Sequence, residues 1–490
     1  MSRRILVAFL VVFALVGAAC AADTEATTTT TAAPAGDTTT TTAASGETTT
    51  TAAAQETTTT EAMDTGPYEH LAMAEAGEYA GTEVEILAQW IEGEGESFEN
   101  TLADFAERTG INIKYNGITD YETVLTVRVE GGDTPDLAQI AQPGLMHAFA
   151  DEGSLVPISD WINVDQLAAD YSTAWTDQAT YNGNVYGVYF KGDTKSLVWY
   201  PVAAFEAAGY AVPQTWDEMI ALSDQIVADG GKPWCVSIEH GDASGWVATD
   251  WIEDILLRTA SVETYEAWLN HEIAFNDPEV LEAAAIVKDI WFDSDYVFGG
   301  NTNINAQWVG DTPKPMFAEG GPDCWMHRQA SWISGFFPAD PTRGTDDEGN
   351  EILYQAGEDA KFFYLPPIEE ASGRPVLGGG DMFVQFNDRP EVRAVLEYLA
   401  TADAPKAWIA EGTFISPNST VPTDWYTTYA GQEIAGILAA ATTLQFDASD
   451  LMPAEVGNGT FWSGMVEWVA ANGGDMEAIF QSIEDSWPEA

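Results

Sequence analysis

Tryptophan residues stand next to polar side chains at several points of this sequence, a pairing that suits carbohydrate binding. The chain has 18 Trp, 17 Tyr and 21 Phe. A sugar has apolar C–H faces and a rim of hydroxyls, so its site needs flat aromatic surfaces together with hydrogen-bonding groups. Packing in a core is the alternative for each Trp taken singly. The pairs are Trp90 beside Gln89, Trp246 after Gly245, Trp251 beside Asp250, and Trp325 near His327 and Arg328.

Three consecutive glycines, Gly378 to Gly380, precede Asp381 and a segment with the pattern of a strand, Met382–Phe386. Glycine allows a neighbouring group to approach the backbone closely, and the Asp381 carboxylate can accept hydrogen bonds from hydroxyls. A tight turn is the alternative explanation of the glycines. We therefore add Gly380 and Asp381 to the candidate ligand-binding residues.

Sequence motifs for catalysis and for metal binding are missing. Gly230-Gly231-Lys232-Pro233 lacks the pattern of a phosphate-binding loop, and no G-x-S-x-G segment exists. The five His form no H-E-x-x-H motif and no cluster with Cys. We expect no catalytic residue, no metal and no cofactor. Carboxylates are so abundant that a glycosidase pair would not stand out among them, so a secreted glycoside hydrolase stays an alternative.

The charge of the chain excludes one class of partner. Asp and Glu total 78 against 18 Lys and Arg, a formal net charge of −60. Nucleic acids are held by clustered Lys and Arg, so we expect no nucleic-acid partner. Hydrophobic residues make up 46% of the chain, which is enough for a sizeable core. The acidity therefore indicates a highly charged surface and says nothing direct about the fold.

Alternating strand and helix patterns begin near residue 81 and predict an α/β fold. Strands are expected at 84–88, 111–115 and 136–140, with helices at 97–109 and 121–131 between them. This order predicts a mostly parallel sheet with right-handed crossovers. Ligands of such sheets bind beyond the carboxyl ends of the strands. The segments there are Gln89–Glu92, Gly117–Asp120 and Ala141–Pro143.

Further elements continue the same pattern. The expected helices are 215–228, 248–259, 262–269, 278–290, 389–400, 456–468 and 474–486, and the expected strands are 196–200, 361–364 and 382–386.

The N-terminus has the pattern of a secretory signal peptide over residues 1–19. Arg3 and Arg4 precede the apolar run Ile5–Val16, which is too short to span a membrane. Gly17-Ala18-Ala19-Cys20 resembles a lipobox, in which Cys20 is lipidated, although Gly17 replaces the usual Leu. The alternative is ordinary cleavage at Ala19-Cys20-Ala21, which removes Cys20.

A Thr-rich segment follows, and it favours the lipidated form. Residues 21–62 contain 19 Thr with Ala, Gly and Glu between them. Such a segment has no large apolar side chains to pack, so we expect residues 20–80 to form a disordered tether. A tether makes sense when its end is anchored, here by lipid on Cys20. Glycosylation or protection of the Thr tracts is the alternative.

Two further cysteines, Cys235 and Cys324, lie 89 positions apart. In an exported protein such a pair favours a disulfide, and two buried free thiols are the alternative.

Several segments resemble the sugar-binding proteins of ABC importers, family 1 of the extracellular solute-binding proteins. Trp199-Tyr200-Pro201, Phe205–Tyr210 and Pro213–Glu218 are similar to a signature of that family. The α-glucoside-binding branch is resembled by Gly245-Trp246, Thr249–Asp254, Cys324–Ser331, and Gly379-Gly380-Asp381 before Arg389–Val392. The resemblance covers roughly residues 82–490.

The resemblance implies a type II periplasmic-binding-protein fold, in which two α/β lobes, each a mostly parallel sheet flanked by helices, close on a sugar about a hinge crossed more than once. Lobe one would be 82–188 with 373–415, lobe two 189–372 with 416–490, and Tyr186–Lys195 part of the hinge. Both cysteines would lie in lobe two.

The function implied is a monomeric, lipid-anchored receptor on the outer face of the cell membrane, which delivers an α-glucoside to an ABC permease without breaking a bond. Trp90 and Trp246 would stack on the sugar, and Trp251 would either do so or pack its helix. Asp120, Asp250 and Asp381 would accept from hydroxyls. Further contacts would come from Gln89, Thr119, Gln142, Lys195 and Gly380. The alternatives are the hydrolase and a carbohydrate-binding surface protein on a Thr stalk.

Overall fold

The computed structural model describes residues 66–345, 349–412 and 414–488. The signal segment 1–19, Cys20 and the Thr-rich residues 21–62 lie outside the described residues. Within the described part, no helix combines the length and the apolar character needed to cross a membrane.

The predicted tether is too long at its C-terminal end, because helix α1 (Glu69–Glu75) belongs to the folded body. It packs on α13 (Pro390–Leu399), and the Leu71 amide donates to Glu397 Oε2 at 2.7 Å. Tyr68 and Tyr79 are buried beside it. These few apolar side chains follow a long polar segment, so composition averaged over the region hid them.

The larger sheet has six strands, and its centre confirms the predicted order of strands and helices. Strand β1 pairs in parallel with β2 and β3, β10 pairs in parallel with β11, and β10 runs antiparallel to β3 and β6. Helix α2 (Glu92–Thr109) ends at Gly110, whose φ of 70° forms a left-handed cap. The strands are β1 (Glu83–Ala88), β2 (Asn112–Gly117), β3 (Leu137–Ile140), β6 (Gly187–Thr194), β10 (Pro375–Gln385) and β11 (Thr443–Phe446).

The second sheet corrects one detail of the predicted architecture, because it is antiparallel rather than mostly parallel. Strand β7 (Leu197–Pro201) pairs in antiparallel fashion with β8 (His327–Arg328) and with β9 (Ala360–Tyr364). Among the described residues of this lobe, parallel pairing is limited to isolated bridges, which join Trp234 to Val297 and Met326, Glu239 to Trp308, and Ala356 to Ala360. Long helical and irregular segments separate these strands, so their order along the chain does not determine which strands become neighbours.

Two large hydrophobic cores divide the described chain. We call first lobe the part built on the larger sheet from α1 to β6 together with α13 and α14. We call second lobe the part from β7 to β9 together with α16 to α18. Tyr189 and Phe190 of β6 pack in the first core, so the boundary expected after residue 188 falls inside a strand. The chain passes between the lobes after β6, at β10, and around α15 and β11.

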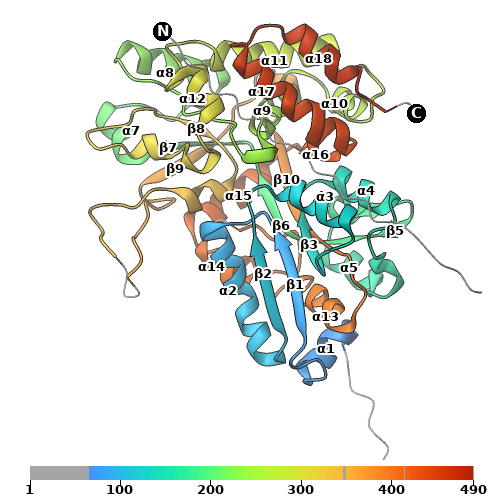
Figure 1. Cartoon of the computed structure of the whole chain (residues 1–490). Helices are drawn as coiled ribbons and strands as arrows, with labels where there is room; N and C mark the ends of the chain where they lie inside the picture. Colours follow the sequence, from blue (N-terminus) through green and yellow to red (C-terminus); the bar gives the residue numbers. More distant parts are fainter. Residues whose placement is uncertain (1–65, 346–348, 413, 489–490) are drawn as a thin grey trace, which may run out of the picture. The chain divides into compact units, whose positions relative to one another are not determined.

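Figure 1 shows the helices of the second lobe gathered at one end of the picture and β1, β2, α2 and α13 at the other. The first lobe also contains α3 (Tyr121–Gly131), α4 (Pro143–Asp151), α5 (Val164–Asp170), α6 (Thr173–Gln178), the hairpin β4 (Thr180–Tyr181) and β5 (Asn184–Val185), and α14 (Lys406–Glu411). The second lobe contains α7 (Val202–Ala208), α8 (Trp216–Ala228), α9 (Trp246–Thr259), α10 (Val262–Leu269), α11 (Pro278–Trp291), α12 (Gly300–Ala306), α16 (Ala448–Leu451), α17 (Trp462–Ala470) and α18 (Met476–Glu484), and α15 (Tyr429–Ala440) joins a third, smaller core.

The third core explains how β7 is held. Alternate residues of a strand face opposite sides of its sheet. Val198 and Tyr200 face the second core, whereas Leu197 and Trp199 face the third. Cys235 and Cys324 lie in the third core and are joined by a disulfide, with their Cα atoms 5.4 Å apart.

Candidate functional site

A cavity lies between the two lobes, and residues of both line it. Its floor is formed where β6 and β10 pair and where the chain passes into α16. The lining residues are Gln89, Trp90, Ile91, Glu94, Glu122, Ala141, Gln142, Lys191, Asp193, Lys195, His240, Ala243, Trp246, Trp308, Val309, Gly310, Trp332, Phe336, Gly380, Asp381, Asp447, Asp450 and Trp462.

The first lobe contributes a wall of amides and carboxylates, which we call the polar wall (Gln89, Glu94, Glu122, Gln142). Gln89 directly follows β1, Glu122 is in the first turn of α3, and Gln142 precedes α4. The Gln89 amide donates to Asp381 Oδ1 at 3.3 Å, and the Gln142 amide donates to Glu122 Oε1 at 3.2 Å. The carboxyl ends of the parallel strands thus bring these side chains to one edge, and Gln89 and Gln142 belong to segments that the sequence predicts there.

The second lobe contributes a wall of aromatic rings, which we call the aromatic wall (Trp246, Trp308, Trp332, Phe336, Trp462). The rings of Trp246 and Trp332 are 6.0 Å apart, and Phe336 packs edge-on against Trp332 at 5.5 Å. Trp462 follows a π-helical segment, Glu455–Phe461, at the start of α17. Flat rings in this number offer an apolar surface to a ligand in the cavity.

Gly245 sets the place of Trp246 at the start of α9. Its φ is 114°, and a Cβ there would lie 2.2 Å from the Trp462 carbonyl oxygen. Only glycine combines this conformation with so close an approach. The Trp246 indole N–H donates to His240 Nδ1 at 2.9 Å, which fixes the ring. Burial lowers the pKa of His240 and favours its neutral form.

The floor of the cavity holds Lys191, a buried cation surrounded by carboxylates. Its Nζ lies 3.2 Å from Glu94 Oε1, 3.2 Å from Asp193 Oδ1 and 3.7 Å from Asp381 Oδ2. Burial alone would lower the pKa of Lys191, but Asp193, Glu94 and Asp381 raise it above its usual value. Lys191 therefore stays charged and is committed to its carboxylate partners.

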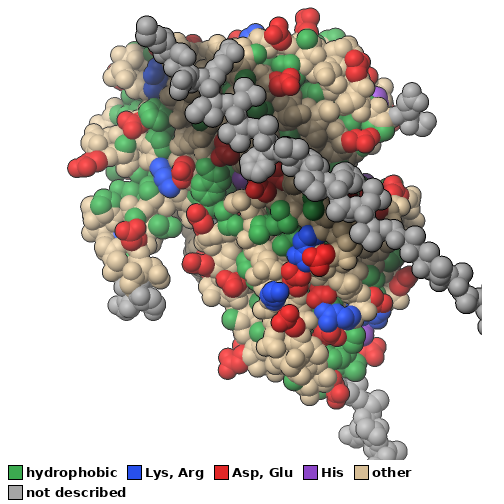
Figure 2. Space-filling model, viewed as in Figure 1, with side chains coloured by type: hydrophobic (Ala, Val, Ile, Leu, Met, Phe, Trp, Pro, Cys, Tyr) green, Lys and Arg blue, Asp and Glu red, His purple; other side chains and the backbone are tan. Residues whose placement is uncertain are grey.

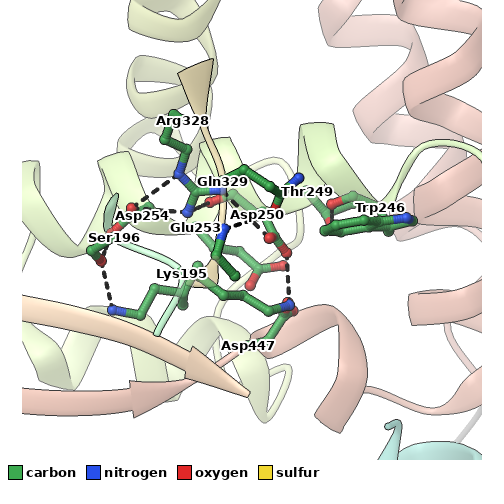
Figure 3. A network of polar contacts seen from close by, with 12 residues as sticks. Lys195, Ser196, Trp246, Thr249, Asp250, Glu253, Asp254, Arg328, Gln329 and Asp447 are labelled. Atoms are coloured by element: carbon green, nitrogen blue, oxygen red, sulfur yellow. Dashed lines mark hydrogen bonds and ion pairs between the residues drawn. The ribbon is translucent and has the colours of Figure 1, made fainter. Parts of the chain in front are cut away.

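The second cation of the floor, Lys195, is held in the same way (Figure 3). Its Nζ lies 3.0 Å from Asp250 Oδ1 and 3.9 Å from Asp450 Oδ2, and it donates to Asp447. Asp250 in turn contacts Arg328, whose Nη1 lies 3.4 Å from Asp250 Oδ2. The network continues below the cavity, where Arg328 and Ser196 both donate to Asp254. It joins β7, β8 and α9 to the floor.

Burial raises the pKa of four lining carboxyls, Glu94, Glu122, Asp381 and Asp450. Burial raises the pKa of Asp381 to about 7, with Lys191 opposing and Asp193 adding to the rise. Burial, with Asp242 nearby, raises the pKa of Glu122 to about 7. Asp242 accepts a hydrogen bond of 2.8 Å from the Thr123 amide, so a second-lobe carboxylate caps the first turn of α3.

The Gly378–Asp381 segment lies inside β10 and is fully buried, so the tight-turn alternative is excluded. A Cβ on Gly380 would lie 2.6 Å from the Lys191 carbonyl oxygen and 2.7 Å from the Trp175 ring. Glycine is required here by close approach of two strands and a ring.

Seven of the predicted ligand-binding residues line the cavity: Gln89, Trp90, Gln142, Lys195, Trp246, Gly380 and Asp381. Trp90 does so from within the first core, since it is 2% exposed and packs edge-on against Phe98, Phe383 and Trp408. Its ring has no free face to stack on a sugar, which corrects the role expected for it.

Four predicted residues lie outside the lining. Thr119 and Asp120 are exposed at the end of β2, and Asp120 is the N-cap of α3. Asp250 is fully buried between Lys195 and Arg328, so it fixes the floor rather than facing the cavity. Trp251 packs between Trp234 and Trp291, because the turn of α9 that exposes Trp246 directs it into the core.

Several lining residues escaped prediction. Glu94 and Glu122 follow the ends of β1 and β2, so the rule on strand ends, applied a few residues further, would have found them. Lys191 and Asp193 lie in the predicted hinge segment, and alternation along that strand would have singled them out. Trp308 and Trp332 come from segments without periodicity, Trp462 comes from the helix expected at 456–468, and no local signal marks any of the three.

Three buried polar atoms of the cavity have no hydrogen-bond partner in the described part of the chain, and one of them, Glu94 Oε1, lies 3.2 Å from Lys191 Nζ in an ion pair. The other two are Gln142 Oε1, an acceptor, and Trp462 Nε1, a donor. Buried polar groups nearly always have a hydrogen-bond partner, so we expect a ligand or a water molecule to bind each of these two atoms. No group of His, Cys, Asp and Glu among the described residues has the arrangement of a metal site.

Comparison with known proteins gives consistent results. The family model described as bacterial extracellular solute-binding protein matches residues 89–404. The osmoprotective compounds-binding protein GgtB of Synechocystis sp. is 42% identical over 406 residues, 83% of this chain and 92% of that protein. The alpha-glucosides-binding periplasmic protein AglE of Rhizobium meliloti is 40% identical over 421 residues, 83% of this chain and 88% of that protein. The solved solute receptor AcbH superposes with a TM-score of 0.69 at 17% identity, covering 83% of this chain and 98% of that one.

Proposed function

This chain belongs to the bacterial extracellular solute-binding proteins, and on that premise we propose that it captures an α-glucoside or a related oligosaccharide between its lobes and delivers it to an ABC permease. The expected family and its two-lobed periplasmic-binding-protein fold are confirmed. The family and the relatives are binding proteins, and the hydrolase and stalk alternatives are not favoured.

The observation that carries the proposal is the pairing of two unlike walls across one cavity. An aromatic wall suits the C–H face of a sugar ring, and a polar wall suits its hydroxyls. The two walls belong to different lobes, so a ligand that touches both favours the arrangement in which the lobes are closed. The name of the Rhizobium relative supports an α-glucoside, and that of the Synechocystis relative supports an osmoprotective solute.

The site residues of the proposal follow from the lining. Trp246 stacks on the sugar, while Gln89, Gln142, Asp381 and Lys195 make or support hydrogen bonds to its hydroxyls. Gly380 shapes the floor by allowing Lys191 of β6 and the Trp175 ring to approach β10 closely. In this proposal the first lobe runs from α1 to β6 together with α13 and α14, the second lobe runs from β7 to β9 together with α16 to α18, and β6 is part of the hinge between them.

A titration of the purified protein followed by tryptophan fluorescence tests the proposal. Maltose, trehalose, sucrose and maltotriose are added separately, and each mixture is analysed for hydrolysis. Saturable binding of one sugar at micromolar concentration, with the sugar recovered intact, is the expected result. Failure of every sugar to bind would exclude the α-glucoside assignment, and release of glucose would favour the hydrolase.

We propose further that the mature chain is a monomer anchored by lipid on Cys20. The lipobox-like segment and the Thr-rich tether support this, and a receptor that serves a permease must stay near the membrane. Mass spectrometry of the mature N-terminus in the native host distinguishes the alternatives. Acyl chains on Cys20 are expected, whereas an N-terminus that begins after Cys20 would exclude the anchor.

A further inference from the structure

The cations of the cavity are fully engaged by the protein's own carboxylates. Lys191 has three carboxylate partners within 3.7 Å, and Lys195 has three within 3.9 Å. No Arg among the described residues lines the cavity, and burial favours the neutral form of His240. An anionic ligand would therefore have to break a buried ion pair to find a cation, which is a costly exchange.

Carboxylates outnumber cations among the lining residues. Six carboxylates face two lysines, and these are Glu94, Glu122, Asp193, Asp381, Asp447 and Asp450 against Lys191 and Lys195. Glu122 differs from the others because no Lys or Arg of the described chain is among the groups that shift its pKa. Its neighbours are Gln142, which donates to it, and Asp242 from the second lobe.

The two unpaired atoms of the cavity define what a ligand group must do. Gln142 Oε1 needs a donor, and Trp462 Nε1 needs an acceptor. A hydroxyl does either, whereas a carboxylate or a doubly ionised phosphate is an acceptor only. A charged oxygen near Gln142 would also lie close to the Glu122 carboxylate, because the same Gln142 side chain binds that carboxylate.

We infer that the cavity selects uncharged polyhydroxylated glycosides and rejects anionic glycosides of the same size, with Glu122 as the specificity-determining residue. The inference rests on the proposed function and narrows its substrate class. Like charges brought together across an interface cost several kcal/mol elsewhere in proteins, which makes such rejection strong.

The acidity of the whole surface must be separated from this local effect. The chain carries a net charge of −60, and Figure 2 shows Asp and Glu side chains spread over the visible face. Surface repulsion is screened by salt, whereas buried charges are screened much less. Rejection that originates in the cavity should therefore persist at high salt.

Calorimetric titration of matched ligand pairs tests the inference. The pairs are maltitol with maltobionate and trehalose with trehalose 6-phosphate, measured at about 0.5 M salt and about pH 8, where Glu122 is ionised. We expect a neutral member to bind and its anionic partner to bind about 100-fold more weakly. Equal affinities, within about threefold, would overturn the inference and leave the proposed function intact. Binding of no member would overturn both.

The variant Glu122→Gln assigns the effect to its residue. It keeps the hydrogen-bonding shape and removes the charge, so we expect the gap between neutral and anionic partners to narrow about tenfold. Glu130→Gln is the matched control, because Glu130 is exposed on the same helix and the substitution changes the net charge equally. An unchanged gap in Glu122→Gln, or an equal change in the control, would overturn the role of Glu122.

Discussion

The two walls of the cavity differ in what they present and in how they are held. The polar wall consists of short segments that follow parallel strands, and it is fixed by the hydrogen bonds that Gln142 donates to Glu122 and Gln89 donates to Asp381 on β10. The aromatic wall comes from helix starts and irregular segments, and ring-on-ring packing fixes it. Hydrogen-bonding groups thus come from the regular strand ends of the first lobe. The apolar surface is formed by segments of the second lobe that are far apart in the sequence.

The largest expected effect comes from breaking the floor that both walls share. In Lys195→Met, Asp250, Asp447 and Asp450 lose their common cation while they remain buried. We expect the free energy of unfolding to fall by about 3–5 kcal/mol and ligand binding to be lost. Chemical denaturation followed by circular dichroism measures the free energy of unfolding, and titration with sugar measures ligand binding.

Lys232→Met is the control for that variant. Lys232 lies 3.4 Å from Asp295, but its side chain is 35% exposed. Solvent screening leaves such a pair worth at most about 1 kcal/mol, and affinity should not change. Equal destabilisation of the two variants would show that the ion pairs of Lys195 contribute no more to the free energy of unfolding than an exposed ion pair does.

The aromatic wall is tested by Trp246→Ala. Removal of this platform should weaken sugar binding about 100-fold, with little loss of stability, because the ring is only half-buried at the cavity surface. Trp425→Ala is matched, since Trp425 is also half-buried but lies outside the cavity. Calorimetric titration of both variants measures their affinity for the sugar. Unchanged affinity in Trp246→Ala would show that this ring does not contact the ligand.

The contrast between Trp246 and Trp90 sharpens the comparison. Trp90 packs in the first core, so Trp90→Ala should cost about 3–5 kcal/mol of stability. A Trp90→Phe variant, which keeps most of the packing, should bind sugar within about threefold of the wild type. If Trp90→Phe is stable but binds sugar much more weakly, the Trp90 ring does stack on the sugar, contrary to its buried position in the structure.

The polar wall should respond less strongly. Gln142→Ala removes one unpaired acceptor and one donor to Glu122, and we expect affinity to fall about tenfold. Gln166→Ala is the control, because Gln166 lies on α5 outside the cavity. A loss in Gln142→Ala as large as that in Trp246→Ala would contradict the division of labour between the walls.

The last effect concerns pH. Because the folded pKa of Glu122 is about 7 and its ordinary value is 4.5, protonation favours the folded state. Its contribution is complete below about pH 4.5 and is lost as pH rises through about 7. Glu122→Gln should remove about 1–3 kcal/mol of this dependence.

Denaturation curves between pH 5 and pH 8 for wild type and Glu122→Gln measure that difference, with Glu130→Gln as reference. Asp381 also has a pKa near 7, so part of the dependence should remain in the variant. Parallel curves for all three proteins would contradict the raised pKa of Glu122.

The fold was largely predictable because strand and helix periodicity is local. The segment from β1 to β3 and helices such as α10 lie where the patterns placed them. The direction of β7, β8 and β9 was not predictable, since pairing between strands separated by more than 100 residues leaves no local trace. The end of the tether was missed because the packing of α1 depends on α13, far along the chain.

Site residues were predictable where they directly follow parallel strands, because the carboxyl ends of such strands meet at one edge of the sheet. They were not predictable where tertiary packing determines whether a side chain faces the cavity or the core. Gln89 and Gln142 follow strands and line the cavity. Trp246 and Trp251 look alike in sequence, yet one faces the cavity and the other the core, because five residues along a helix turn the side chain away. The sequence marks Asp250 as a polar candidate but does not show that it is buried. Its position between Lys195 and Arg328 appears only in the tertiary structure.

A crystal structure of the protein grown with the neutral disaccharide that binds most tightly tests the central claim most directly. We expect one sugar between the walls, with a ring face against Trp246 and hydroxyls paired with Gln142 Oε1 and Trp462 Nε1. A sugar bound elsewhere, or one in the cavity that leaves both of these atoms unpaired, would contradict it.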